Sequence, residues 1–132
     1  MEAMEFVART RLAVFAPNAD VLVDEEQQAI TVVIEVAGAD AESLRFGFDG
    51  RWLVIAGRRS KPRQIRQSSF LQKEIAYGEF VKRIRLPVAI KCDAVSASYE
   101  DGFLTIVAAI EPGAYARTEK SELHLVITRT HS

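Results

Sequence analysis

Apolar and polar side chains alternate strictly in the second half of this chain, and the alternation predicts a β-strand. Val95, Ala97 and Tyr99 are separated by single serines, which places the three larger side chains on one face of a strand. Asp101-Gly102 follows, and a second apolar run covers residues 103–106. Because an Asp-Gly pair between two such runs is a strong signal for a tight turn, the sequence predicts a β-hairpin here.

Similar runs occur along most of the chain. β-Branched residues dominate residues 29–36, and Leu44, Phe46 and Phe48 alternate with Arg45 and glycine ahead of another Asp-Gly pair. Short strands separated by turns at intervals of about 8–12 residues are typical of a β-sandwich. The sequence therefore predicts an all-β, immunoglobulin-like sandwich with no long helix and no internal repeat. Further strands are expected at 20–23, 52–55 and 80–86.

Two connections interrupt this pattern. Residues 57–78 show no helical periodicity, and loops of this length in compact domains usually have a function of their own. Within them, Phe70 to Ile75 is a candidate for a separate short strand. Pro112, Gly113 and several charges then mark a linker, and apolar alternation returns over residues 123–127. The expected parts are a short N-terminal arm (1–16), a sandwich domain (17–110) and a C-terminal extension (111–132).

Composition and charge exclude several classes of protein. Apolar residues make up 48% of the 132 residues and charged residues 27%, which is ordinary for one globular domain and argues against global disorder. The net charge of −1 gives no overall attraction to nucleic acid or to anionic membranes. No apolar run approaches the roughly 20 residues that span a bilayer, and the acidic start does not resemble a secretory signal. With one cysteine, a cytoplasmic protein is expected.

Candidate chemistry is sparse. A run of five basic residues lies between Arg58 and Arg66, but no aromatic residue interleaves it as base stacking requires, so a solvated loop or pairing with acidic groups across a dimer is favoured over nucleic acid. Cys92 is a weak candidate for a catalytic nucleophile. The two histidines, His124 and His131, lie in the tail, and the sequence singles out no acid that would orient one of them toward the thiol. The two histidines make a poor metal site without further ligands. We expect no catalytic residues, no metal site and no cofactor.

Six short segments, taken in their order along the chain, resemble one family. They are Pro17 to Val21, Val36 to Leu44, Leu53 to Arg59, Glu74 to Phe80, Leu86-Pro87 and Ala97 to Leu104. Each segment alone is a weak match, but the ordered set resembles the signature of the small heat-shock protein (α-crystallin) family. The resemblance covers residues 17–110 and implies an α-crystallin domain.

The resemblance also implies a function and partners. Members of this family are ATP-independent holdases, chaperones that bind partly unfolded client proteins and suppress their aggregation. The chain lacks a G-x-x-x-x-G-K-[ST] phosphate loop, in keeping with this function. In bacterial and plant-type members the long loop gives a strand to a partner subunit, which implies a strand-swapped dimer through Phe70, Leu71 and Ile75. The C-terminal motif, Leu125 and Ile127 here, would dock in an apolar groove of another subunit lined by Leu44, Phe46, Phe48, Val95, Ala97 and Tyr99.

The sequence departs from the family pattern in places. Only 16 residues precede Pro17, Lys82 stands where an arginine is frequent, and Leu125 takes the first position of the tail motif. A non-holdase adaptor of the p23/CS type on a related sandwich is therefore the alternative, although the long loop disfavours it. Two further alternatives stay open at this point. Residues 123–127 form either an intermolecular docking motif or a final strand of the same sandwich, and the arm is either an assembly segment or disordered.

Overall fold

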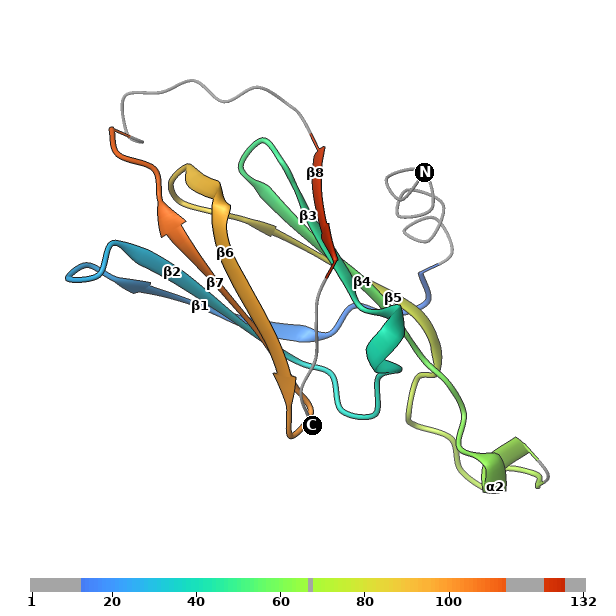
Figure 1. The fold of residues 1–132 in the computed structure, drawn as a ribbon. Coiled ribbons are helices and arrows are strands. Elements are labelled where there is room, and N and C mark those ends of the chain that lie inside the picture. Colours follow the sequence, from blue (N-terminus) through green and yellow to red (C-terminus); the bar gives the residue numbers. More distant parts are fainter. Residues whose placement is uncertain (1–12, 67, 114–122, 128–132) are drawn as a thin grey trace.

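Two antiparallel four-stranded sheets face each other in the computed structural model, which describes residues 13–66, 68–113 and 123–127 (Figure 1). The strand orders are β1-β2-β7-β6 and β5-β4-β3-β8. The expected all-β sandwich is confirmed. Its elements are β1 (Asn18–Asp24), β2 (Ala29–Glu35), a 3-10 turn η1 (Ala41–Ser43), β3 (Arg45–Asp49), β4 (Trp52–Arg59), α2 (Arg63–Arg66), β5 (Gly78–Arg85), β6 (Ile90–Glu100), β7 (Phe103–Ile110) and β8 (Leu123–Ile127).

The core lies between the sheets and is built from alternate strand positions. In β2 every second residue, Ile30, Val32 and Ile34, is at most 1% exposed, because neighbouring side chains of a strand point to opposite faces. Phe46 and Phe48 from β3 meet in an edge-to-face contact with ring centroids 6.1 Å apart. The remaining large core residues are Leu44, Leu53, Ile55, Phe80, Leu86, Leu104 and Ile106.

The predicted hairpin between β6 and β7 is present. Asp101 and Gly102 have φ angles of 53° and 83°, the left-handed backbone that a two-residue turn matched to strand twist requires. A Cβ at position 102 would lie 3.2 Å from the Cα of Ala37. Glycine is therefore favoured at position 102 by both the backbone angle and the close approach.

Contacts of the sandwich begin before Pro17. The backbone N–H of Val14 donates to the carbonyl of Glu79 at 2.8 Å, and the N–H of Val81 donates to the carbonyl of Phe15 at 3.2 Å. The Phe15 ring also packs on the Phe80 ring with centroids 5.4 Å apart. Residues 14 and 15 are thus held against β5.

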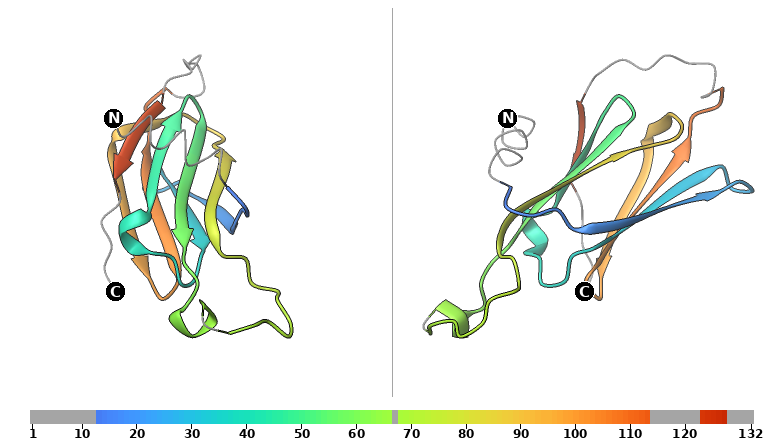
Figure 2. Two further views of the ribbon diagram at one scale, coloured as in Figure 1. Left: turned by 90° about the vertical axis from the view of Figure 1, so that its right-hand side faces the viewer. Right: turned by 180° about the vertical axis from the view of Figure 1, so that it is seen from behind.

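The long connection between β4 and β5 contains one regular element, the short helix α2. Phe70 to Ile75, a candidate strand from sequence, has no strand conformation in the described chain. A strand needs a neighbour to accept its backbone hydrogen bonds, and none of the strands that the structure describes pairs with this segment (Figure 2). No helix among the described residues is long and apolar enough to cross a membrane.

Candidate protein-interaction site

The edge formed by β1 is the most exposed apolar part of the described sandwich. β1 stands at the end of its sheet and pairs with β2 along one side. Val21, Leu22 and Val23 are 42%, 51% and 50% exposed. A sheet edge presents a row of N–H and C=O groups to any strand that approaches it. β1 therefore combines a backbone template with an apolar surface.

Both faces of β1 are open. Val21 and Val23 pair with Val32 and Ile30, which are buried in the core, so they occupy the inner face of the sheet. They are nevertheless exposed because the β1–β2 hairpin projects beyond the opposite sheet (Figures 1 and 2). Sequence reading missed this surface, although three consecutive apolar residues flanked by acids are visible at Asp20 to Asp24.

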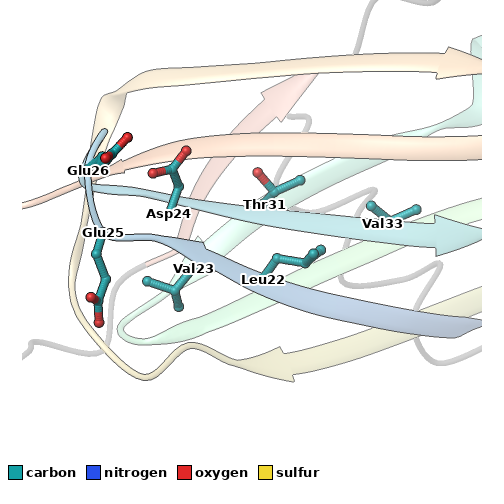
Figure 3. Close-up of a pocket in the computed structure, with 7 residues that line it drawn as sticks. All are labelled: Leu22, Val23, Asp24, Glu25, Glu26, Thr31 and Val33. Carbon is teal, nitrogen blue, oxygen red and sulfur yellow. The ribbon is translucent and has the colours of Figure 1, made fainter.

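A surface pocket lies at the tip of this hairpin (Figure 3). Its walls are apolar residues and a threonine from β1 and β2, and acidic residues of the turn line its end. The turn is fixed by the N–H of Gln27, which donates to Asp24 Oδ1 at 3.0 Å, and by Gln28 Nε2, which donates to the carbonyl of Glu25. The lining residues are Leu22, Val23, Asp24, Glu25, Glu26, Thr31 and Val33. The pocket suits an apolar group followed by positive charge.

The long loop carries the second apolar surface. Phe70, Leu71 and Ile75, the predicted swap residues, are 43%, 104% and 56% exposed. Lys61 and Lys73 flank the Phe70 ring at 5.9 and 5.8 Å from its centroid. In Figures 1 and 2 this loop and the β1–β2 turn lie at opposite ends of the molecule. The two apolar surfaces of one chain therefore do not meet within that chain.

Two arginines at the end of β4 anchor the base of the loop. Arg59 Nε donates to the carbonyl of Ala76 at 2.9 Å, and its Nη1 donates to the carbonyl of Ala37 at 3.1 Å. Arg58 Nε donates to Asp40 Oδ2 at 2.8 Å. These contacts hold the start and end of the loop against the turn that follows β2.

Electrostatics at this base favour an ionised carboxylate. Burial acts to raise the pKa of Asp40, but hydrogen bonds from Ser60 and Arg58, together with the charge of Arg58, outweigh it and hold that pKa below its ordinary value. The Ser60 hydroxyl donates to Asp40 Oδ2 at 2.7 Å. The side chains of Arg58 and Asp40 are 42% and 24% exposed, so solvent screens the pair in part.

The six residues predicted to line a docking groove come together across the two sheets. Leu44, Phe46 and Phe48 are at most 1% exposed, and the three β6 residues pack against the same core cluster while partly buried. In the single chain the first three side chains lie in the interior, whereas Val95, Ala97 and Tyr99 keep part of their surface exposed. The hydroxyl of Tyr99 donates to the carbonyl of Val36 at 2.8 Å and accepts from the N–H of Ala39 at 3.1 Å.

The backbone of β8 pairs with β3 of the same chain. In this register Leu125 and Ile127 stand opposite Gly47 and Arg45, whereas Val126 stands opposite the core residue Phe46. A shift of one residue exchanges the two faces of a strand. In the single chain, residues 123–127 therefore form a strand of the same sandwich, which was one of the two alternatives left open by the sequence. In this register the core residue Phe46 stands opposite Val126 and not opposite Leu125 or Ile127.

The titratable side chains of the described residues do not gather into a metal site. They contain no group of three or more His, Cys, Asp and Glu side chains that could hold a metal ion. Cys92 is half-buried at the start of β6 and packs against the core. His131 lies outside the described residues, as do Met4, Phe6 and the rest of the first twelve residues.

Comparison with known proteins agrees with this geometry. The model of the Hsp20/alpha crystallin family matches residues 22–122. The 16.9 kDa class I heat shock protein 3 of Oryza sativa subsp. japonica is 35% identical over 95 residues, which cover 71% of this chain and 63% of the rice protein. This chain therefore spans less than two thirds of that relative. Small heat shock protein C2 of Rickettsia felis is 26% identical over 107 residues, covering 81% of this chain and 67% of that protein.

Solved structures show the same sandwich. HSP18.5 from E. histolytica superimposes with a TM-score of 0.63 at 26% identity, over 74% of this chain and 89% of that one. A small heat-shock protein from Xylella fastidiosa, described as having a distinct high order structure, gives a TM-score of 0.61 at 25% identity, over 73% and 86% of the two chains.

Proposed function

The chain belongs to the Hsp20/alpha crystallin family, and from this premise we propose that it is an ATP-independent holdase of the cytoplasm. It binds partly unfolded proteins and suppresses their aggregation. An enzymatic role through Cys92, which is half-buried and packs against the core, is not proposed. The p23/CS-type adaptor is not pursued further, because the family match covers residues 22–122 with the long loop included.

The observation that carries this proposal is the exposed apolar edge of β1. Partly unfolded proteins offer extended apolar segments whose backbone groups lack partners. An edge strand binds such a segment through main-chain hydrogen bonds, while apolar side chains add affinity for alternate residues of the segment. Val21, Leu22 and Val23 supply that combination on the β1 edge.

Self-association would regulate access to this edge. We expect Phe70 to Ile75 of a second copy to occupy β1 in a strand-swapped dimer, since both partners are exposed and apolar. Leu125 and Ile127 would support larger assemblies by docking in another subunit. Heat or subunit exchange would then uncover the β1 edge for clients.

Light scattering from a heat-denatured client tests the function. At equimolar subunits the protein should reduce scattering without ATP. Replacing Leu22 with Ser should weaken the protection, whereas Trp52→Ser, which removes a side chain of comparable exposure (40%) from β4 in the other sheet, should leave it intact. Undiminished scattering with the unmodified protein, or equal loss in both variants, would contradict the proposal.

A further inference from the structure

We propose that the outer face of β1, β2 and β7 is a second docking surface, which takes segments of partly unfolded proteins that carry both apolar and basic side chains. The inference rests on the proposed function and adds a surface other than the β1 edge, together with the class of client segment that this surface selects. It starts from a segregation of charge between the two sheets, which the net charge of −1 conceals.

Acidic and basic side chains are divided between the two sheets. In the sheet β1-β2-β7-β6 the charged strand residues are Asp20, Asp24, Glu35, Lys91, Asp93 and Glu100. In the opposite sheet, β4 and β5 carry Arg58, Arg59, Glu79, Lys82, Arg83 and Arg85. The first sheet is therefore mainly acidic and the second mainly basic, so a cationic segment is attracted to the first and repelled by the second.

The outer face of the acidic sheet is centred on β2. The core positions of this strand alternate with the outward residues Thr31, Val33 and Glu35. Thr31 pairs with Leu22 of β1, and Glu35 pairs with Phe103 of β7. Leu22 and Phe103 are 51% and 46% exposed. The face thus presents two exposed apolar side chains with smaller side chains between them.

Acidic side chains border this apolar strip. In the strand ladder Phe103 stands between Glu35 of β2 and Glu100 of β6, and both glutamates are exposed. On β1, the residues two positions before and after Leu22, on the same face, are also acidic: Asp20 and Asp24. The described strands β1, β2 and β7 contain no lysine or arginine. A segment that lies on this face is therefore stabilised by basic residues beside its apolar ones.

The face is hollowed along the β1–β2 hairpin. One hollow is the pocket at the hairpin tip, which Leu22 and Val33 line together with the acidic turn (Figure 3). The residues that line a second hollow are Asn18, Ala19, Asp20, Val33, Glu35 and Phe103. Because Val33 lines both, the hollows adjoin and follow β2 from Thr31 to Glu35. This length accommodates roughly four residues of extended chain.

An extended client segment fits this groove better than a second copy of the chain does. The exposed basic residues Arg83 and Arg85 belong to a strand within a sheet, whereas the two hollows follow a single hairpin. Partly unfolded proteins offer single extended segments in which apolar and basic residues are mixed. The outer face is also distinct from the β1 edge, so the groove stays accessible when another strand pairs with that edge in the proposed dimer.

Peptide binding tests the selectivity. Fluorescein-labelled peptides of alternating leucine and lysine, of leucine and glutamate, and of serine and lysine are titrated with the full chain, and fluorescence anisotropy gives their dissociation constants. The leucine–lysine peptide should bind about tenfold more tightly than either of the others, because it alone matches both the apolar strip and its acidic border. Its affinity should fall as the salt concentration is raised.

Variants on the outer face locate the binding. Phe103→Ser and Glu35→Lys should each weaken binding of the leucine–lysine peptide by about tenfold. The matched controls are Trp52→Ser, at an exposed aromatic residue of the other sheet, and Glu42→Lys, at an exposed acidic residue of η1. Both controls should leave the affinity unchanged. A chain that carries both Glu35→Lys and Glu100→Lys should instead prefer the leucine–glutamate peptide.

The outcomes separate this surface from the proposed function. Equal affinity for the leucine–lysine and leucine–glutamate peptides, or equal effects of the face variants and their controls, would overturn the inference. If the unmodified protein still suppresses client aggregation in that case, the proposed function stands without it. Selective peptide binding with no suppression would overturn the proposed function instead. A lower mass for Phe103→Ser in size exclusion with light scattering would assign the face to a second copy and not to clients.

Discussion

The guanidinium of Arg59 lies 4.6 Å from the centroid of the Phe15 ring. The same side chain donates to the carbonyls of Ala37 and Ala76. Arg59 therefore joins three segments that are distant in sequence: the residues ahead of β1, the turn after β2 and the end of the long loop. It lies in one of the segments that resemble the family, but its contacts could not be foreseen from that pattern.

Replacing Arg59 with Ala should destabilise the fold by about 2 kcal/mol, because two hydrogen bonds from a charged donor and a cation–π contact are lost. Urea unfolding at a fixed protein concentration measures the change. Arg59→Lys should recover only part of it, since an ammonium cannot reproduce the planar fork. Arg63→Ala, an exposed site in α2, is the matched control, and an equal loss there would refute the assignment.

Gly57 is required for packing rather than for backbone freedom. An added Cβ would lie 2.5 Å from Cζ of Phe80 and 2.9 Å from Cδ2 of Leu44. Both neighbours are fully buried, so we expect Gly57→Ala to cost about 1–3 kcal/mol through overpacking. Thermal unfolding followed by circular dichroism measures this.

Gly113→Ala separates the two glycine effects. Position 113 has open space around it but a φ of 73°, so its cost should be about 1 kcal/mol from backbone strain alone. If Gly57→Ala is as stable as the unmodified chain, the Phe80 ring can shift to make room for the added Cβ, and the expected overpacking is absent.

The Tyr99 hydroxyl ties β6 to the turn after β2 through Val36 and Ala39. Tyr99→Phe should destabilise the protein by about 1–3 kcal/mol, because partly buried backbone groups lose their partner. Tyr77→Phe in the long loop changes the same atom at a half-buried site and should have little effect. Comparable midpoints of urea unfolding for the two variants would contradict this role of Tyr99.

The Asp40–Arg58 pair predicts a pH-dependent contribution to stability. Because the pKa of Asp40 is lower in the folded chain than its ordinary value of 3.8, the unfolded chain binds the proton more readily. The contribution is therefore present above pH 4 and is lost as the pH falls through the folded-state pKa.

Asp40→Asn tests this sign. The variant should be less stable than the unmodified chain at pH 7, and the gap in the free energy of unfolding should narrow as the pH falls below about 4. In an Arg58→Gln background the pH dependence of that gap should shrink. A gap that stays constant with pH would mean that Asp40 acts through its hydrogen bonds alone.

The exposed loop offers a test of the dimer that leaves the fold intact. Leu71 is 104% exposed, so Leu71→Asp should not affect the folded monomer but should leave the chain monomeric in size exclusion with light scattering. Gln64→Asp adds the same charge in α2 and should retain the dimer. An unchanged mass for Leu71→Asp would rule out this segment as the swapped strand.

Regular alternation predicted the strands well. The hairpin that spans Asp101-Gly102 was expected from its residues, and the structure supplies the positive φ angles that such a turn needs. β6 begins earlier than expected, at Ile90, because a register irregularity between Ile90 and Val95 breaks the alternation. Sequence reading therefore found only the regular half of this strand.

Partner choice was much harder to predict. The pattern over residues 123–127 predicted an apolar alternation but not which edge it pairs with or in which register, since both depend on β3. Phe70 to Ile75 has strand-like composition, yet its conformation depends on a neighbour that its own chain does not provide. The apolar β1 edge was missed because Val21 and Val23 occupy inward positions, and only the three-dimensional reach of the hairpin exposes them.

The loop and the β1–β2 hairpin lie at opposite ends of the folded molecule (Figure 2), and this placement limits how many copies one chain can bind through them. Each chain brings one donor segment and one acceptor edge to the proposed pairing. Two copies that exchange donors reciprocally satisfy both, and the exchange closes at two instead of growing into a fibre. A third copy can join such a pair only through a different contact, so changes at β1 or the loop and changes at β8 should affect separate steps of assembly.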